Sequence, residues 1–284
     1  MTSENQNPPR VASLHIYPVK SCAGIEVESF KITPRGPQFD REWMIVDDET
    51  GIFVTQRILP SLARIQTRLS PTHLIVGVPQ PSGETEEFKF LLENSVSLQK
   101  TRNVKVWEDT CLAIDEGDEI AKALRDFLGG KPVRLVRMDQ NARRLIPEKY
   151  NRPGSHVSFA DGFSVLLLTK ESLADLNARL PSPVPMNRFR PNIVVEGARP
   201  YEEDSWTKVR IGDINFESPK LCDRCVIVNT DQSSGRRDVE PLKTLASYRR
   251  GEKNKVYFGQ NLTHLNEGFL KIGDEVSDVI RPQN

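Results

Sequence analysis

The stretch VASLHIYPVKSCAGIEVESFKI (residues 11–32) holds two runs rich in β-branched and aromatic residues, 11–19 and 24–32, joined by a short polar turn. Such runs between turn residues predict β-strands. Five more short runs of this kind follow, separated by Pro, Gly or Asp, at 42–47, 62–69, 73–78, 87–92 and 104–109. This spacing is typical of an antiparallel barrel or sandwich, so the N-terminal part is expected to form a β-rich, barrel-like lobe.

Helices are predicted from residue 116 onward. Residues 116–130 carry apolar side chains at helical spacing and end on Gly129-Gly130, a helix stop. Residues 164–180 predict a strand that runs into a helix capped by Thr169. A last helix is expected at 241–250, with Pro241 at its first position. Further strands are predicted at 133–137, 192–197, 206–218 with a turn at Gly212-Asp213, 225–230, and around VYFGQ and GDEVSDVI.

These elements predict an α+β, β-rich fold, in which the N-terminal barrel-like lobe packs on a mixed β-barrel domain with a few helices. The expected division is a disordered polar tail at 1–10, the first domain at 11–137 and the second at 138–284. The polar stretch from Asp139 to about Phe159 has little periodicity. It is either a functional loop over a site or a disordered segment.

Composition excludes several classes of protein. The 284 residues include 39 basic and 39 acidic side chains, so no overall field attracts nucleic acid. No apolar run approaches the roughly 20 residues of a transmembrane helix. Only four cysteines are present, which favours a reducing intracellular compartment over a disulfide-bonded secreted scaffold. The scattered histidines and the absence of GxGxxG, GxxxxGK[ST] and HExxH argue against the commonest nucleotide and zinc sites.

The close cysteine pair CDRC at 222–225 is the strongest chemical motif. A thiolate at this strand would be stabilised by the neighbouring Arg224 and would make a good metal ligand. Alternatively, Cys222 and Cys225 are ordinary buried residues, or they form a redox-active dithiol, although no thioredoxin-like βαβ context accompanies them. A zinc site would normally need a second pair, which the sequence lacks.

Cations follow or precede several predicted strands. Lys20 and Ser21 stand in HIYPVKSCAG, Arg41 in FDREWMIVD and Arg190 in NRFRPNIVV. The side chains of Lys20, Arg41 and Arg190 could each bind a phosphate, and each could equally be solvated or paired with a nearby acid. The residues alone leave these alternatives open.

Seven collinear segments together resemble a known family: YPVKSCAG (17–24), FDREWMIVD (39–47), SLADLNARL (172–180), NRFRPNIVVEG (187–197), DSWTKVRIGD (204–213), CDRC with EPLKTLASYRR (222–250), and FGQN (258–261). They are similar to the MOSC N-terminal β-barrel and MOSC domain of the mitochondrial amidoxime-reducing component family. The resemblance runs from about Ser13 to Val279.

The resemblance implies a site for molybdenum bound to molybdopterin. The second cysteine of the family's motif is the metal ligand and falls on Cys225, and Asp161 is expected to face the metal as a second catalytic residue. The family's cofactor contacts fall on Lys20, Ser21, Arg41, Gly162, Phe163, Arg190, Asp223 and Asn261. The family has an aromatic residue at the position of Asn261, so any role of that ring is lost here.

The implied activity is the two-electron removal of oxygen from N-hydroxylated substrates such as amidoximes, hydroxylamines and N-hydroxylated bases. The resemblance also implies that electrons come from cytochrome b5 and its NADH-dependent reductase. The chain has no cysteine cluster that could hold an iron–sulfur centre of its own. The alternative is a non-catalytic MOSC module that binds or transfers the cofactor or its sulfur. The substrate preference would rest on the 139–160 loop.

Location and assembly are expectations of the same kind. The chain as given carries no transmembrane segment, and nothing in it demands more than a monomer. Membrane-bound relatives have an N-terminal anchor. If such an anchor has been removed here, the mitochondrial outer membrane facing the cytosol is expected, and otherwise the cytoplasm.

Overall fold

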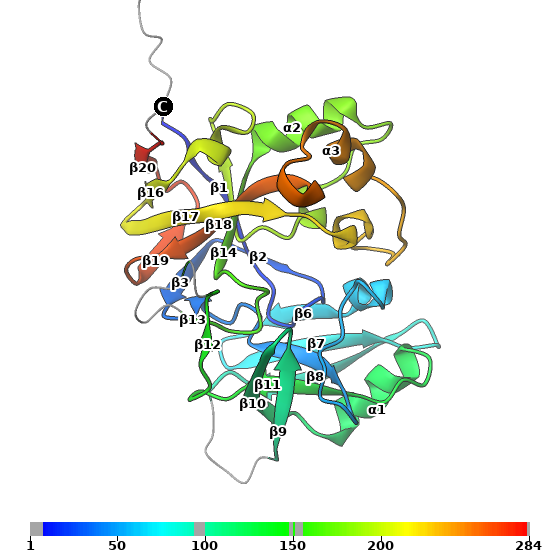
Figure 1. The fold of residues 1–284 in the computed structure, drawn as a ribbon. Helices are drawn as coiled ribbons and strands as arrows, with labels where there is room; N and C mark the ends of the chain where they lie inside the picture. The colour runs from blue at the N-terminus through cyan, green and yellow to red at the C-terminus, as the bar shows by residue number, and fades with distance from the viewer. Residues whose placement is uncertain (1–7, 94–99, 148–149, 151–155, 283–284) are drawn as a thin grey trace, which may run out of the picture.

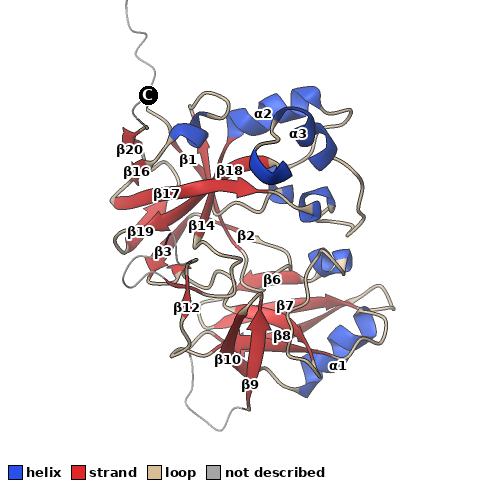
Figure 2. Cartoon of the chain, in the orientation of Figure 1, coloured by secondary structure: helices blue, strands red, loops and turns tan. Residues whose placement is uncertain are grey.

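The computed structural model describes residues 8–93, 100–147, 150 and 156–282, and it shows the predicted β-rich α+β fold (Figures 1 and 2). The described residues hold three α-helices: α1 (Asp118–Phe127), α2 (Lys170–Arg179) and α3 (Leu242–Tyr248). None of the helices in this part of the chain is long and apolar enough to cross a bilayer. Strands make up most of the remaining regular secondary structure and form two lobes, one above the other in Figure 1.

An eight-stranded sheet forms the upper lobe. Its strands lie in the order β2 (Ile25–Val27), β1 (Arg10–Ile16), β15 (Ile193–Glu196), β14 (Val165–Thr169), β18 (Tyr257–His264), β17 (Ile214–Asp223), β16 (Lys208–Ile211) and β20 (Val276–Ile280). A smaller sheet of β19 (Gly268–Lys271), β3 (Ser29–Thr33) and β4 (Gly36–Pro37) contributes Phe30, Ile32 and Leu270 to the same apolar core. Helices α2 and α3 cover the lobe at its upper right in Figure 1.

The lower lobe is built from two further sheets. One contains β5 (Trp43–Asp47), β11 (Val133–Met138), β10 (Asp109–Asp115) and β9 (Thr101–Val106), and the other contains β6 (Gln66–Leu69), β7 (His73–Pro79) and β8 (Thr85–Leu91). Helix α1 packs against them through Ile120 and Leu124, which share a buried core with Trp43 and Leu74. The short ladder of β12 (Arg144–Leu145) and β13 (His156–Val157) lies beside the junction of the lobes.

The first strands lie in the upper lobe, although they come early in the chain. Strand β1 pairs with β15, with Leu14 opposite Ile193. Sequence patterns show that a strand exists but not which distant strand it pairs with. Because β1 to β4 lie in the upper lobe and β5 lies in the lower lobe, the chain between β4 and β5 crosses from one lobe to the other. Of the predicted 1–10 tail, residues 1–7 lie outside the described part, and Arg10 already begins β1.

Several local predictions are confirmed. The Thr169 side chain caps α2 by accepting a hydrogen bond from the Ser172 amide. Gly129 and Gly130 follow α1 with φ angles of 70° and 85°, conformations that glycine adopts without steric cost. The hairpin predicted at Gly212-Asp213 joins β16 to β17. Helix α3 begins one residue later than predicted, with Pro241 as its N-cap.

Other local predictions are wrong. The run CVIVNT (225–230) is not a strand, because Val226–Asn229 form a 3-10 helix, η5. Residues 62–64, predicted as part of a strand, belong to a second 3-10 helix, η1 (Pro60–Arg64). β-Branched residues favour strands through packing rather than backbone preference, so tertiary context overrides them. Within the 139–160 loop, β12 and β13 pair, while residues 148–149 and 151–155 lie outside the described part.

A buried carboxyl group makes stability depend on pH. Glu203, in the 3-10 helix η4 (Glu202–Ser205), is fully buried and accepts hydrogen bonds from the Ser172 and Thr169 hydroxyls. Burial raises the pKa of Glu203 to about 7, although these hydrogen bonds oppose the shift. The folded state therefore binds this proton more tightly than the unfolded state.

We expect the free energy of unfolding to fall by about 2 to 3 kcal/mol as pH rises from roughly 4.5 to 7, and to lose no more from this group above that range. Glu203→Gln should remove this slope, because an amide does not titrate. Urea unfolding of the native protein and of the Glu203→Gln variant at several pH values measures how the free energy of unfolding of each depends on pH. Parallel stability profiles for the two proteins would contradict the assignment.

Candidate functional site

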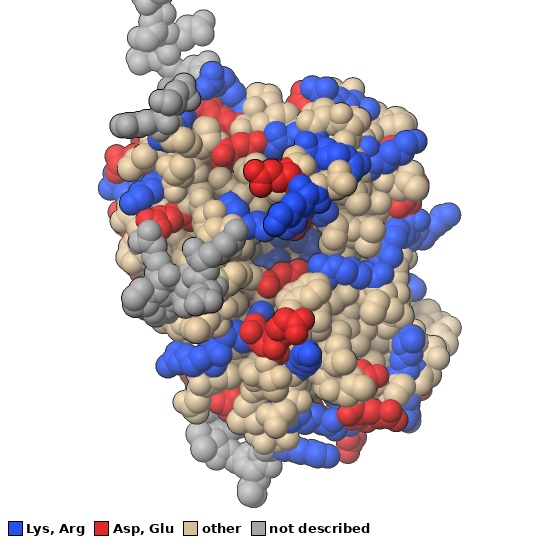
Figure 3. Space-filling model, in the orientation of Figure 1, with Lys and Arg blue, Asp and Glu red and all other residues tan. Residues whose placement is uncertain are grey.

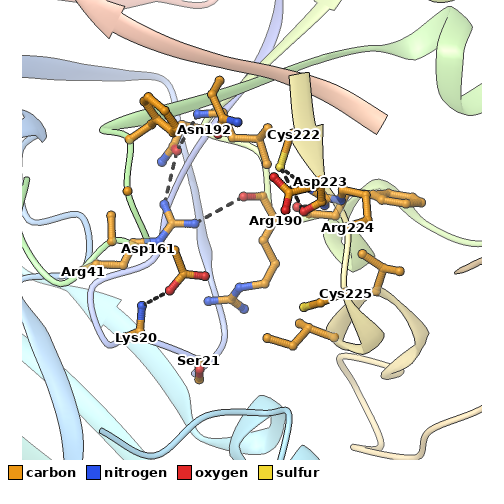
Figure 4. A pocket seen from close by; sticks show the side chains of 18 of the residues that line it. Lys20, Ser21, Arg41, Asp161, Arg190, Asn192, Cys222, Asp223, Arg224 and Cys225 are labelled. Carbon is orange, nitrogen blue, oxygen red and sulfur yellow. Dashed lines mark hydrogen bonds and ion pairs between the residues drawn. The ribbon is translucent and has the colours of Figure 1, made fainter. Parts of the chain in front are cut away.

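A pocket lies between the two lobes and is lined by segments far apart in the sequence (Figure 3). All ten site residues predicted from the sequence line it: Lys20, Ser21, Arg41, Asp161, Gly162, Phe163, Arg190, Asp223, Cys225 and Asn261. The loop between β1 and β2 supplies Lys20 and Ser21, and the crossing segment between β4 and β5 supplies Arg41. The loop before β14, the segment before β15 and the end of β17 supply most of the others (Figure 4). The structure thus brings the residues together, and their roles stay predictions.

Cys225 stands where the chain leaves the large sheet and begins η5. Its side chain is partly exposed, and its sulfur points into the pocket (Figure 4). Cys222 is held differently, because its sulfur accepts a hydrogen bond of 2.9 Å from Arg224 Nη1. Both thiols are free. No group of three or more His, Cys, Asp or Glu within the described ranges could hold a metal ion. A metal bound at Cys225 would therefore need most of its ligands from a cofactor.

Two guanidinium groups lie over one aromatic ring in this pocket. The Arg41 and Arg190 guanidinium carbons are 4.3 and 4.2 Å from the centre of the Tyr17 ring. Both Asp40 carboxylate oxygens accept from Arg41, at 2.7 and 2.6 Å. Arg190 instead donates to the Cys22 carbonyl at 2.7 Å, and burial lowers its pKa to about 10 although Tyr17 opposes the shift. Arg190 is thus a partly buried cation without a carboxylate partner among the described residues.

Unpaired donors show what the pocket could bind. Arg190 Nη2, Arg188 Nε and Arg224 Nε are buried and have no hydrogen-bond partner in the described structure. Buried donors are normally paired, so each marks a place for an acceptor. The lining contains six cations, Lys20, Arg41, Arg57, Arg188, Arg190 and Arg224, but only two acids, Asp161 and Asp223. An anionic group such as a phosphate fits this arrangement.

Lys20 and Asp161 join the walls of the pocket. The Lys20 ammonium donates to the Phe159 carbonyl at 2.7 Å and to Asp161 Oδ1 at 2.5 Å. Burial lowers the pKa of Lys20, and Asp161 opposes that shift. Enclosure by the pocket would raise the pKa of Asp161, but Lys20, Arg57 and Trp107 outweigh this and hold that pKa below its usual range. With its side chain 55% exposed, Asp161 stays a carboxylate near the pocket mouth.

Three residues that line the pocket have a strained backbone. Ser21, Arg41 and Arg190 have φ angles of 68°, 51° and 57°, in the left-handed region that non-glycine residues seldom adopt. Such conformations persist where surrounding contacts enforce them, and they are common at functional sites. The Arg41 amide, for example, donates to the Tyr17 carbonyl at 2.8 Å. The strain fixes the direction of these three side chains.

The remaining predicted residues contribute to the walls. Asp223 carboxylate oxygens accept from Lys220 at 2.5 Å and from Lys255 at 3.0 Å. Asn261 on β18 donates to the Leu221 carbonyl at 3.3 Å, so it supports β17, the strand that carries Cys222 and leads to Cys225. Phe163 packs on Tyr150 with ring centres 5.4 Å apart.

Sequence reasoning missed four polar lining residues, Thr55, Arg57, Arg188 and Asn192. Asn192 links the arginines to the sheet, since its amide oxygen accepts from Arg41 at 3.2 Å and its nitrogen donates to Asp40 at 3.0 Å. Arg188 and Asn192 lie inside the quoted segment NRFRPNIVVEG, which could have drawn attention to them. The Arg57 guanidinium carbon lies 4.6 Å from the centre of the Trp107 ring, and no motif in the sequence pointed to this residue.

Comparison with known proteins agrees with this organisation. The model of the MOSC N-terminal beta barrel domain matches residues 8–131, and that of the MOSC domain matches residues 154–277. Mitochondrial amidoxime-reducing component 1 of Homo sapiens is 33% identical over 94% of this chain and 82% of its own length. Mitochondrial amidoxime reducing component 2 of Bos taurus is 32% identical over 95% of this chain and 83% of its own length.

Another relative differs in size. Molybdenum cofactor sulfurase of Oryza sativa subsp. japonica is 33% identical over 96% of this chain, but the chain spans only 36% of that protein. The MOSC pair is thus shared between proteins with different names and lengths. On these matches, the chain belongs to the family of MOSC-domain proteins with an N-terminal MOSC β-barrel that includes the mitochondrial amidoxime-reducing components.

Proposed function

We propose that this chain binds molybdenum as molybdopterin, with Cys225 as the protein ligand of the metal, and reduces N-hydroxylated compounds. The observation that carries the proposal is a free Cys225 thiol in the same pocket as three buried arginine nitrogens without partners. A soft thiolate suits molybdenum, and guanidinium groups suit the phosphate of the pterin. The relatives named for amidoxime reduction support the choice of substrate class.

The side chains divide the task between them. Arg190, Arg188 and Arg224 would hold the anionic end of the cofactor, and Lys20, Ser21 and Arg41 would complete its cradle. When bound, the molybdenum centre supplies the two-electron chemistry that removes oxygen from the N–OH group. Asp161 would keep a negative charge at the mouth, where it can orient the N–OH hydrogen. The cofactor carries the difficult step, while the protein contributes binding and electrostatics.

We further propose cytochrome b5 and its NADH-dependent reductase as the electron source. The names of the amidoxime-reducing relatives also make association with mitochondria the proposed location. The second candidate is a module that binds or transfers the cofactor or its sulfur, which the match to a molybdenum cofactor sulfurase favours.

Analysis of metal and pterin together with an activity assay distinguishes the reductase from the module that binds or transfers the cofactor or its sulfur. We expect close to one molybdenum and one molybdopterin per chain after expression in a host that makes the cofactor. We also expect NADH-dependent reduction of N-hydroxybenzamidine when cytochrome b5 and its reductase are added. Bound cofactor without turnover would favour the transfer module. A preparation free of both molybdenum and pterin would contradict the cofactor site itself.

A further inference from the structure

A second hollow lies directly behind the CDRC segment. It is lined by η5, the loop before α3, α3 itself and the segment before β18, and we call it the basic hollow. We infer that the basic hollow is the docking surface for an acidic one-electron donor protein. The inference rests on the proposed reductase function and adds the place where the electrons arrive.

The charge of the hollow favours an acidic partner. Its lining includes five cations and two acids: Arg224, Arg237, Lys243, Arg250 and Lys255 against Asp223 and Asp238. Asp223 is already neutralised by Lys220 and Lys255. No ion pair within the described ranges uses Lys243 or Arg250, and both are exposed. Figure 3 shows lysine and arginine side chains gathered over this upper right face.

Apolar side chains complete the surface. Val226 and Val239, both in the lining, are 40% and 57% exposed. Exposed apolar residues within a charged rim are typical of protein interfaces. The surface is also concave, so it fits a convex protein lobe better than the flat face of a bilayer, whose contacts would need protruding side chains.

A single chain segment separates the two cavities. Asp223 and Arg224 line both of them, whereas Cys225, Ile227 and Val228 line only the cofactor pocket, and Val226 and Asn229 line only the basic hollow. A donor seated in the hollow would therefore face the back of the segment that carries Cys225. The partner would not need to enter the pocket, which leaves its mouth open to the substrate.

The electrons balance with a one-electron haem protein as donor. Two reduced donors dock in turn, and each is oxidised by one electron. With two protons from solvent, the two electrons break the N–O bond of the substrate and leave R–NH2 and water. Long-range charge attraction guides each encounter, so the rate of delivery should fall as salt increases.

The test is reversal of the two free charges, Lys243→Glu with Arg250→Glu. With a cytochrome b5 haem domain as donor, we expect the KM for the donor to rise by roughly tenfold or more and to lose its dependence on salt. With dithionite-reduced methyl viologen as donor, the rate should stay within about twofold of the native rate, because a small reductant needs no docking surface. Lys122→Glu with Arg125→Glu, two exposed cations of α1 in the other lobe, is the matched control.

The outcomes separate the two proposals. If the native protein turns over with viologen but the Lys243/Arg250 variant keeps the native KM for the haem protein, only the docking inference fails. An equal loss in the α1 control would also overturn it, since the effect would then be one of net charge. If the native protein does not turn over with viologen, the reductase function fails, and the docking inference falls with it.

Discussion

Replacing Cys225 with serine should leave the purified protein with little molybdenum and lower the rate of N-hydroxybenzamidine reduction by more than about a hundredfold. Loss of a residue that only supports a metal ligand typically lowers metal affinity or activity by about ten- to a hundredfold, so the loss of the ligand itself should exceed that range. A serine hydroxyl is a hard, protonated group at neutral pH and a poor substitute for a thiolate towards this metal. The Cys225 sulfur points into the pocket and has no competing hydrogen bond in the described structure. Metal analysis and the assay with reduced viologen measure both effects.

Cys222→Ser is the matched control, because Cys222 lines the same pocket three residues earlier. Its sulfur accepts from Arg224, and a serine oxygen can accept the same bond. We expect this variant to keep its molybdenum and most of its activity. If the two variants lose metal equally, the ligand assignment to Cys225 alone is wrong. If only Cys222→Ser loses it, the assignment is reversed.

Arg190→Met should lower the bound molybdopterin by ten- to a hundredfold at limiting cofactor, the range expected when a charge-assisted hydrogen bond of about 1.5 to 3 kcal/mol is removed. In the cofactor-free protein the same change should leave the melting temperature unchanged or raise it. The Arg190 side chain is partly buried and has no carboxylate partner in the part of the chain that the structure describes, and its buried Nη2 has no hydrogen-bond partner there. Replacing a buried, poorly paired charge with an apolar side chain of similar length is often neutral or stabilising.

Arg190→Lys provides the comparison for this prediction. Lysine keeps the positive charge but cannot reproduce the planar fork of donors, so it should restore only part of the binding. Pterin content after incubation with cofactor and thermal unfolding of the cofactor-free proteins are the two readouts. A clear drop in the melting temperature of Arg190→Met, with unchanged pterin content, would show that Arg190 serves the fold rather than the cofactor.

Patterns within short stretches of the chain were enough to predict the class of the fold and the identity of many site residues. Short β-branched runs, the Thr169 cap and the stop at Gly129-Gly130 are local features, set by propensity and capping that act within a few residues. The resemblance then selected ten residues, and all ten line one pocket. Local chemistry and a collinear motif order were sufficient for this much.

How these parts meet could be seen only in the folded structure. It joined β1 to β15, turned the β-branched run after Cys225 into η5, and placed Arg57, Arg188 and Asn192 in the pocket. It also set the two cavities on opposite sides of the CDRC segment. The pairing of β1 with β15 and the contact of Arg190 with the Cys22 carbonyl each join residues more than a hundred positions apart. Local propensity carries no information about such contacts, because their energies exist only once the chain is packed.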